Sequence, residues 1–261
     1  MNTICLIKRR CAWLWVAASL LWGPLAIAAD PGDLESAYRL QTKAIHLQLA
    51  GQQPLGFKAG LTSRAAQQRF GASGPVAGVL PANAELGRQV RLQDFLQPML
   101  ELELAFRLRE PVDTPIASVA ALKDLVAAFT VAVEFPDLGL LTLPGGEAGR
   151  APSVADIIAA NVGAKHLILG NTLRLADQSP DDITLKLLLN GQDLRVAQSS
   201  DLSDGQWQTL LFLVNRTVAS GWRIEPEQWL LTGALGGMMP LQAGEYRLLS
   251  DLGKIRFSVV P

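Results

Sequence analysis

The chain has 261 residues, of which 49% are hydrophobic and 18% charged, with 23 basic side chains against 24 acidic ones. This near-neutral balance argues against a nucleic-acid-binding protein, which would need a strongly basic surface. The length and hydrophobic content suit a single domain with a sizeable core.

The first 28 residues have the form of a cleavable secretory signal peptide. Basic residues 8–10 precede an apolar run over 11–22, and residues 26–28 supply the small-x-small pattern that signal peptidase recognises. We therefore expect cleavage after Ala28, giving a periplasmic or secreted protein of residues 29–261 without a stable membrane span. An uncleaved anchor is the alternative, although the apolar run is shorter than the roughly 20 residues that a span needs.

Both cysteines of the chain, Cys5 and Cys11, lie inside this leader. The mature domain therefore has no disulfide to rely on in an oxidising compartment, and its stability must come from its core. Removing the three basic leader residues from 23 leaves 20 against 24 acids, a net charge of about −4. Nucleic acid is again disfavoured as a partner.

The first part of the mature chain contains one lysine of particular interest. Lys58 lies in a short predicted strand between two glycines, and it is either a surface residue or a buried acid/base with a lowered pKa. Taken alone, the segment favours the surface alternative. The predicted elements of this part are a helix over 33–50, the strand over 55–63, a short helix over 64–70 and a Gly/Pro-rich loop over 71–81.

The stretch from Met99 to Phe106 predicts a strand that carries two acids on one face. Side chains alternate along a strand, so Glu101 and Glu103 share one side while the leucines between them face the other. Two carboxylates held close in a low-dielectric setting must either take up a proton or share a cation, and a divalent metal satisfies both acids. The alternative is an edge strand with a solvated acidic face.

A third acid, Glu134, lies on the next predicted strand. A helix-length segment separates it from Glu103, which is enough chain to bring the two strands side by side; the alternative is an exposed glutamate at a strand end. The remaining predictions are a helix over 118–129, the strand over 130–137, a loop over 145–152, a helix capped by Ser153 with Asp156 in its first turn, a strand over 166–169, a hairpin at Asn190-Gly191, a helix over 205–221, a loop over 234–239 and a closing β-hairpin over 244–260. This pattern predicts an α+β fold, with an antiparallel-rich sheet core and helices around it.

Several motifs recur in a characteristic order along the mature chain. They are Gly56-Phe-Lys58-Ala-Gly-Leu-Thr62, Gly78-Val-Leu80, Glu101-x-Glu103-x-Ala-Phe, Glu134, Asp156-Ile-Ile-Ala-x-Asn161 with Leu169-Gly170, Asn190-Gly191, Leu231-Thr-Gly233 and Ala243-Gly244. In order and spacing, they resemble the 2-keto-4-pentenoate hydratase and 4-oxalocrotonate decarboxylase branch of the fumarylacetoacetate hydrolase superfamily. The similarity covers essentially the whole mature chain.

This resemblance implies a mixed β-roll with peripheral helices, assembled into homo-oligomers. It also implies a Mg²⁺ or Mn²⁺ ion held by Glu101, Glu103 and Glu134, with Lys58 as the catalytic acid/base. The substrate contacts that it implies are Leu61, Asn161 and Thr232.

Physical chemistry makes sense of that residue set. Three carboxylates leave coordination sites of a hard divalent cation free for the oxygens of a small 2-hydroxy-dienoic or 2-oxo acid. The metal then stabilises the charge of an enolate, and Lys58, its pKa lowered by the cation and by burial, can shuttle protons. The resemblance therefore implies a metal-dependent lyase, either a hydratase or a decarboxylase.

Departures from the family pattern leave a second function open. The chain has Val76 or Ala77 where the hydratases usually have an acid, Gly163 where they usually have serine, and Ala234 in place of another serine. A secretory signal is also unusual for enzymes of aromatic degradation, which are generally cytoplasmic. The alternative is an extracytoplasmic binding protein that keeps the fold and the metal site without efficient turnover.

A third function, hydrolysis of acylpyruvates as in other members of the superfamily, ranks last. It would require a Glu-His pair to activate water. The two histidines, His46 and His166, do not lie near a suitable acid in the sequence.

Overall fold

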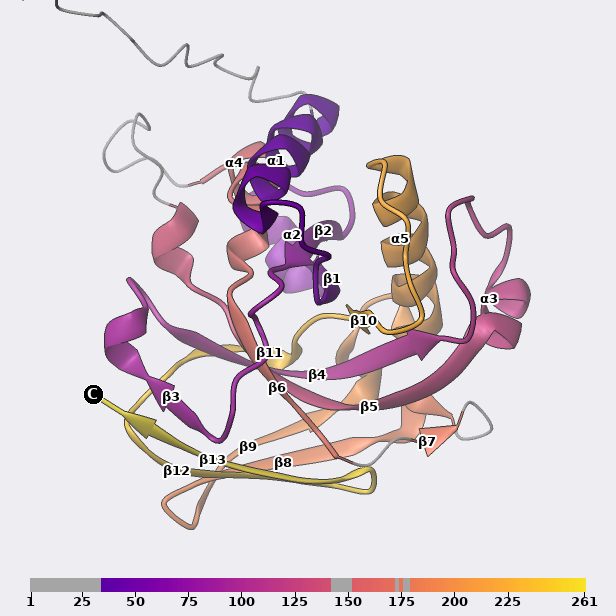
Figure 1. Cartoon of the computed structure of the whole chain (residues 1–261). Helices are drawn as coiled ribbons and strands as arrows, with labels where there is room; N and C mark the ends of the chain where they lie inside the picture. The colour runs from indigo at the N-terminus through magenta and orange to yellow at the C-terminus, as the bar shows by residue number, and fades with distance from the viewer. Residues whose placement is uncertain (1–33, 142–151, 172–173, 176–178) are drawn as a thin grey trace, which may run out of the picture.

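The structure, a computed structural model, describes residues 34–141, 152–171, 174–175 and 179–261 (Figure 1). In this part of the chain, two β-sheets pack together and helices cover the outside, as Figure 1 shows for α1 (Leu34–Leu49) and α5 (Gly205–Ala219) above the central strands. The predicted α+β class is confirmed. The predicted leader over 1–28 lies outside the described residues, as does most of the predicted loop over 145–152.

The larger sheet contains the strands that carry the predicted site. Its strand order is β2-β1-β10-β4-β5-β6, with β11 paired to β4 and β7 paired to β5. The strands are β1 (Gly56–Gly60), β2 (Val76–Leu80), β4 (Met99–Leu108), β5 (Val126–Phe135), β6 (His166–Leu169), β7 (Arg174–Leu175), β10 (Trp229–Leu231) and β11 (Leu235–Pro240).

This sheet closes on itself into a roll. The segment that follows β2 pairs with β6, because Leu86 N donates to the Leu167 carbonyl at 2.8 Å and Leu167 N donates to the Ala84 carbonyl at 2.9 Å. Buried residues from β2, β4, β5, β6 and β10 accordingly pack into one cluster that includes Ala105 and Ala132. By the alternation of side chains, Glu103 on β4 faces the same interior as Ala105.

The second sheet packs against the first and completes the core. Its strand order is β3-β13-β12-β8-β9, and Figure 1 shows β8, β9, β12 and β13 as a layer below β4 and β5. Tyr246 and Phe257 stack within this sheet, and Phe257 meets Phe135 of the roll edge to face. The strands are β3 (Gln89–Arg91), β8 (Thr184–Leu189), β9 (Gln192–Gln198), β12 (Gly244–Ser250) and β13 (Gly253–Val260).

The remaining helices are short and peripheral. The predicted cap at Ser153 is confirmed, because Ser153 and Asp156 form a reciprocal capping box. Within the described residues, no helix is long and apolar enough to cross a membrane. These helices are α2 (Arg64–Phe70), α3 (Val119–Leu125) and α4 (Val154–Ala159), with 3₁₀ turns η1 (Leu92–Asp94), η2 (Leu138–Leu141), η3 (Asn161–Gly163), η4 (Pro180–Asp182) and η5 (Ser199–Asp201).

Three predicted segments were wrong in type or in extent. The predicted loop over 71–81 contains β2, which pairs with β1 along its whole length, and the predicted loop over 234–239 contains most of β11. The predicted helix over 118–129 ends at Leu125, and its last residues open β5 instead. In each case, pairing with a neighbouring strand overrides a local composition typical of loop or helix.

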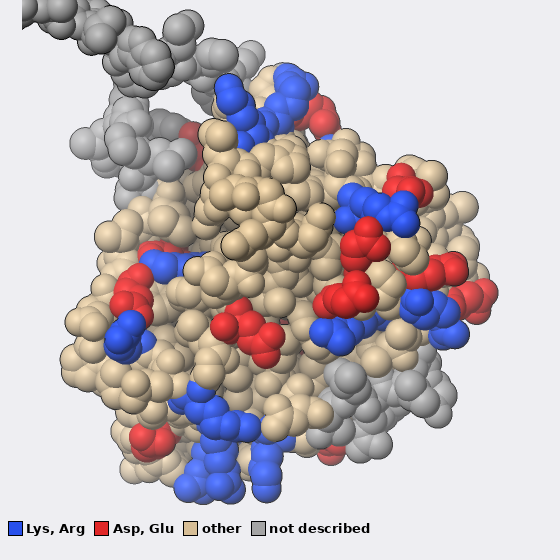
Figure 2. Space-filling model, viewed as in Figure 1, with Lys and Arg blue, Asp and Glu red and all other residues tan. Residues whose placement is uncertain are grey.

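Surface charges are mixed on the face shown in Figure 2. Acidic and basic side chains are interspersed there among a majority of other residues. Such a face offers no single strong field of one sign.

Asp137, just after β5, is a buried charge for which the sequence predicted no role. Its Oδ1 accepts hydrogen bonds from the backbone N–H groups of Gln97 (2.7 Å) and Gly139 (3.1 Å), and its Oδ2 accepts one from Leu96 N (2.9 Å). Lys165 Nζ lies 2.7 Å from the same Oδ2. This carboxylate therefore fixes the chain after β5 to the segment before β4.

We expect Asp137→Asn to lower the free energy of unfolding by about 1.5–3 kcal/mol, the usual range for hydrogen bonds to a charged group. The amide keeps one acceptor oxygen and turns an NH₂ group toward N–H donors. Urea unfolding measures the loss, and Asp94→Asn is the matched control because the Asp94 side chain is solvent-exposed and pairs with exposed Arg91. An equal loss in both variants would contradict this role.

The same group gives a pH dependence. Burial would raise the pKa of Asp137, but the hydrogen bonds from Lys165 and from the Gln97 and Leu96 backbone hold it below its ordinary value. A carboxyl whose folded pKa is lowered contributes stability above its unfolded pKa, and the contribution is lost as the pH falls through the folded pKa. The difference between the parent and Asp137→Asn should therefore shrink in acid.

Candidate metal and acid–base site

Three buried carboxylates meet on the inner face of the roll. In the antiparallel pairing of β4 with β5, Glu101 lies directly opposite Glu134, and Glu103 follows two residues later on the same face. One oxygen from each of the three lies within 4.8 Å of the others. Glu103 and Glu134 have no solvent exposure, and Glu101 is 7% exposed.

Lys58 enters this group from β1. Its Nζ lies 2.7 Å from Glu134 Oε2 and 3.7 Å from Glu101 Oε2, and the residue is only 2% exposed. The surface position that the segment alone favoured is therefore wrong. The reason is that the sheet closes into a roll, and the face of β1 that carries Lys58 turns toward the interior carboxylates.

The charges in this site do not balance. Three carboxylates face one ammonium group, and among the described residues Lys58 is the basic side chain that forms ion pairs with them. Burial, opposed by Lys58 and assisted by Glu134, raises the pKa of Glu101 to about 7. Burial and the neighbouring Glu134 also raise the pKa of Glu103 well above its usual value.

For Lys58 itself, burial works against the charged form, but the three carboxylates outweigh it and hold the pKa of the lysine above its usual range. The lowered pKa predicted from the sequence assumed a neighbouring cation. Among the protein groups alone, the direction is the opposite, and Lys58 is an ammonium group.

The carboxylate oxygens show whether the site fits a metal. Glu103 Oε2 accepts a hydrogen bond from Gly233 N at 2.8 Å, whereas Glu103 Oε1 and Glu134 Oε1 are buried without a hydrogen-bond partner in the described part of the chain. A buried charged oxygen without a partner is costly. Hard divalent cations prefer oxygen ligands of this kind, so the residues present fit Mg²⁺ or Mn²⁺.

The three predicted substrate contacts lie around this site. The polar side chains among them, those of Asn161 and Thr232, already form hydrogen bonds within the protein. Asn161 Oδ1 accepts from Val79 N at 2.7 Å, and Asn161 Nδ2 donates to the Val79 carbonyl at 2.7 Å. The Thr232 hydroxyl donates to Gln206 Oε1 at 2.6 Å. Leu61 follows β1 in a left-handed conformation, with a φ of 54°. Their roles toward a substrate stay predictions.

A tightly packed wall supports the stem of Lys58. A Cβ on Gly78 would lie 3.3 Å from Lys58 Cγ and 2.9 Å from the Asn161 carbonyl oxygen, so glycine is needed for this approach. A Cβ on Gly60 would lie 2.4 Å from Val162 Cγ1. Val162 itself has a φ of 55°, a strained value for a β-branched residue.

The residues that depart from the family pattern lie near this packed region. Gly163, where the hydratases usually have serine, has a φ of +66°, a conformation that glycine adopts without strain. Val76 is buried in β2, and Ala234 is half-buried next to Gly233. These positions therefore carry no polar side chain toward the carboxylates.

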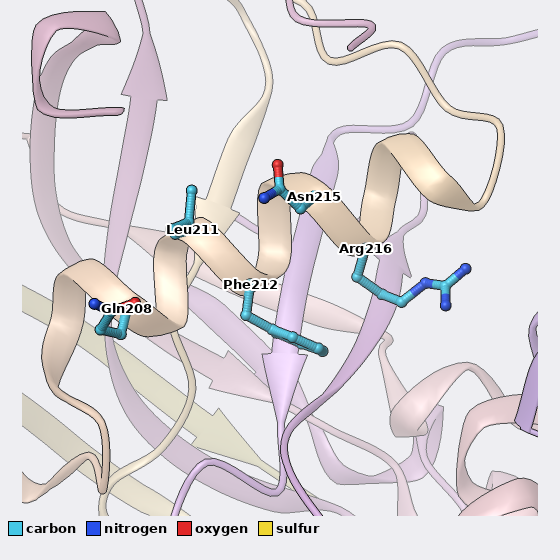
Figure 3. Close-up of a pocket in the computed structure, with 5 residues that line it drawn as sticks. All are labelled: Gln208, Leu211, Phe212, Asn215 and Arg216. Carbon is cyan, nitrogen blue, oxygen red and sulfur yellow. The ribbon is translucent and has the colours of Figure 1, made fainter. Parts of the chain in front are cut away.

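A separate pocket lies on α5, and the residues that line it do not include an acid. Figure 3 shows the five residues that line it, which are Gln208, Leu211, Phe212, Asn215 and Arg216. Asn215 exchanges two hydrogen bonds with the Ile116 backbone, and Arg216 pairs with Glu35. No lining residue offers a carboxylate, imidazole or thiol, so the triad remains the candidate site.

Sequence reasoning missed two residues that contact the site or its neighbours. Gly233 gives its N–H to Glu103, and Gln206 accepts the hydroxyl hydrogen of Thr232. The Thr-Gly pair after a strand was a usable signal for Gly233. Nothing local marks Gln206, because its role depends on where α5 packs.

Comparison with curated proteins gives relatives at low identity. The chain is 29% identical over 217 residues to a TodF product hydratase of Pseudomonas putida, covering 82% of this chain and 78% of the relative. It is 28% identical over 243 residues to a 2-keto-4-pentenoate hydratase of Paraburkholderia phymatum, covering 90% and 89%. No protein-family model matches the chain.

Comparison with solved structures gives the same fold. The 4-oxalocrotonate decarboxylase of Pseudomonas putida G7, complexed with magnesium and adipate, superposes with a TM-score of 0.78 at 18% identity. The match covers 87% of this chain and 86% of that protein. The resemblance predicted from the sequence and the β-roll fold are thus confirmed. The homo-oligomer stays a prediction.

Proposed function

We propose that this chain, which resembles the hydratase and decarboxylase branch of the fumarylacetoacetate hydrolase superfamily in sequence and fold, is a divalent-metal-dependent lyase. Its substrate would be a small 2-hydroxy-dienoic or 2-oxo acid. The observation that carries the proposal is the buried cluster of Glu101, Glu103 and Glu134 with Lys58 Nζ 2.7 Å from one of the three carboxylates. The named activities of the relatives support it.

The carboxylates and the lysine would divide the work. When bound, Mg²⁺ or Mn²⁺ would supply an electrophile for the carboxylate and adjacent oxygen of the substrate. Glu101, Glu103 and Glu134 would hold the ion, with Glu103 fixed by the Gly233 N–H. Burial of the site excludes bulk water and strengthens every charge interaction inside it.

Lys58 would move the protons. As an ammonium group beside Glu134, it can donate a proton to a substrate carbon and recover it later. In a hydratase, a dienol acid gains a proton at carbon and gives up its enol proton, and water then adds across the remaining double bond. In a decarboxylase, the bond to the departing CO₂ breaks, and a proton takes its place on the same carbon.

A binding protein without efficient turnover is the second candidate. The apolar or small residues at positions 76, 163 and 234 favour it, because they remove polar groups that could orient substrate or water. Hydrolysis through a histidine ranks lower. His46 stacks on Trp222 with ring centroids 4.4 Å apart, and His166 Nδ1 lies 3.3 Å from the Ala84 carbonyl oxygen, so each has a structural partner elsewhere.

Metal analysis of the purified protein, followed by an ultraviolet assay, tests the proposal. A panel of dienol and 2-oxo acids would be incubated with the parent protein and Mg²⁺ or Mn²⁺, with EDTA as the control. Metal-dependent loss of the conjugated chromophore is the expected result. Binding of such acids without any conversion would decide for the binding protein.

We also propose that the protein acts outside the cytoplasm, since its first 28 residues have the form of a signal peptide. Mature protein recovered from the cell envelope should begin at Ala29 or Asp30. Intact-mass measurement and N-terminal sequencing check this. An intact Met1 in that fraction would refute it.

A further inference from the structure

We propose that Gln206 and Thr232 are positioning residues for the metal ligand Glu103, acting through the Gly233 N–H. The inference rests on the proposed metal site and adds a line of hydrogen bonds that runs from the start of α5 to one carboxylate oxygen. Its consequence is that metal affinity depends on a glutamine that contacts neither the ion nor the substrate.

The line ends at Glu103. Gly233 N donates to Glu103 Oε2 at 2.8 Å, and Glu103 Oε1 is left without a hydrogen-bond partner among the described residues. One oxygen of this carboxylate is therefore fixed by the backbone. The other is presented to the interior that it shares with Glu101 and Glu134. A carboxylate held in this way has less freedom to lose when it binds a cation.

Thr232 sets the position of that N–H. Its own N–H donates to the Leu104 carbonyl at 3.2 Å, and its hydroxyl lies 2.6 Å from Gln206 Oε1 and 3.3 Å from the same Leu104 oxygen. Both ends of the residue are thus tied, and Thr232 has no solvent exposure. The Cα of Thr232, from which the peptide plane to Gly233 extends, is therefore held in place on both sides.

The orientation of Gln206 follows from its partners. Its Nε2 donates to the Ser199 carbonyl at 2.7 Å, and because a carbonyl only accepts, the amide oxygen must face Thr232. The threonine hydroxyl is therefore the donor in the 2.6 Å contact. Gln206 is fully buried, and its own N–H donates to Asp181 Oδ1 at 3.2 Å.

The turn at Gly233 is tightly packed. Its φ is +99°, and a Cβ there would lie 2.5 Å from Thr62 Oγ1 and 2.6 Å from Thr62 Cγ2. Thr62 is itself buried, so the turn is packed on its far side. A side chain at position 233 would therefore clash with Thr62, and glycine is needed at this turn.

The test is Mn²⁺ affinity, measured by calorimetry and by electron paramagnetic resonance on the parent, four single variants and one double variant. Thr232→Val and Gln206→Met remove the contact between the two side chains at nearly constant volume. Thr232→Ser keeps the hydroxyl. Thr217→Val is the matched control, because Thr217 is a buried threonine on α5 whose hydroxyl has no hydrogen-bond partner among the described residues.

Thr232→Val and Gln206→Met should each weaken Mn²⁺ binding about 10- to 100-fold, the usual effect of losing a group that orients a ligand. Thr232→Ser should bind like the parent, and so should Thr217→Val. The double variant Thr232→Val/Gln206→Met should be no weaker than the weaker single variant, because both changes break the same bond. Circular dichroism and metal-free melting confirm that each variant is folded.

Unchanged affinity in both Thr232→Val and Gln206→Met would overturn the inference while leaving the metal site in place. Equal weakening by Thr217→Val, or by Thr232→Ser, would also overturn it, because the hydroxyl would not be the cause. Should Thr232→Val fail to fold, Gln206→Met against Thr217→Val decides the matter. A parent that binds no Mn²⁺ would instead overturn the proposed metal site, and this inference with it.

Discussion

Lys58→Ala is expected to lower the turnover rate of the parent about 10²- to 10⁴-fold, the usual contribution of a positioned general acid or base. The Lys58 ammonium group lies 2.7 Å from Glu134 Oε2, and its stem packs against Gly78. Alanine keeps the strand and removes the proton donor. Steady-state kinetics on whichever dienol or 2-oxo acid the parent converts measure the change.

Metal binding separates this role from a general loss of structure. Because lysine is not a ligand, Lys58→Ala should keep Mn²⁺ affinity close to that of the parent or raise it, since a positive charge next to the cation is removed. Lys186→Ala is the control, because Lys186 is half-exposed and pairs with exposed Asp193. A Lys58→Ala protein with full activity would rule out the catalytic assignment.

The binding-protein alternative gives a different pattern. In that case the parent converts no acid of the panel, and Lys58→Ala weakens only the capture of an anionic ligand. The rate comparison and the ligand affinity therefore distinguish the two functions in one pair of proteins.

Residues 101–106 show why much of the site could be predicted from sequence. Alternation along a strand is a local property, so the shared face of Glu101 and Glu103 followed directly from their spacing. The helix-length separation before Glu134 predicted an adjacent strand, and the structure places Glu134 directly opposite Glu101. The bounds of α2 and the hairpin at Asn190-Gly191 also followed from local signals.

The errors arose where distant parts of the chain decide the local structure. Several glycines and prolines gave residues 71–81 the composition of a loop, yet one of them, Gly78, is required within a strand because Asn161, Val162 and Lys58 pack against it. The burial of Lys58 depends on strands β2 and β10, which flank β1 although one of them lies some 170 residues away. Gln206 could not be found at all, because its partner Thr232 reaches it only after α5 has packed.

Substitution in the carboxylate triad is expected to have the second large effect, which is the loss of metal binding. Mn²⁺ or Mg²⁺ should raise the melting temperature of the parent, and free metal at 100 times its Kd corresponds to about 2.7 kcal/mol of added stability. Glu101→Gln and Glu134→Gln should each remove this response, because an amide supplies a neutral and weaker ligand in place of a carboxylate. Differential scanning calorimetry with and without EDTA measures it.

The two variants should differ without metal, which makes the test sharper. Both changes relieve repulsion among the acids, but Glu134→Gln breaks the 2.7 Å ion pair with Lys58, whereas Glu101→Gln removes the 3.7 Å contact and keeps the closer pair. The metal-free melting temperature should therefore fall further in Glu134→Gln. Glu110→Gln, at an exposed position, should match the parent in both conditions. If Glu101→Gln and Glu134→Gln both respond to metal like the parent, these carboxylates are not its ligands.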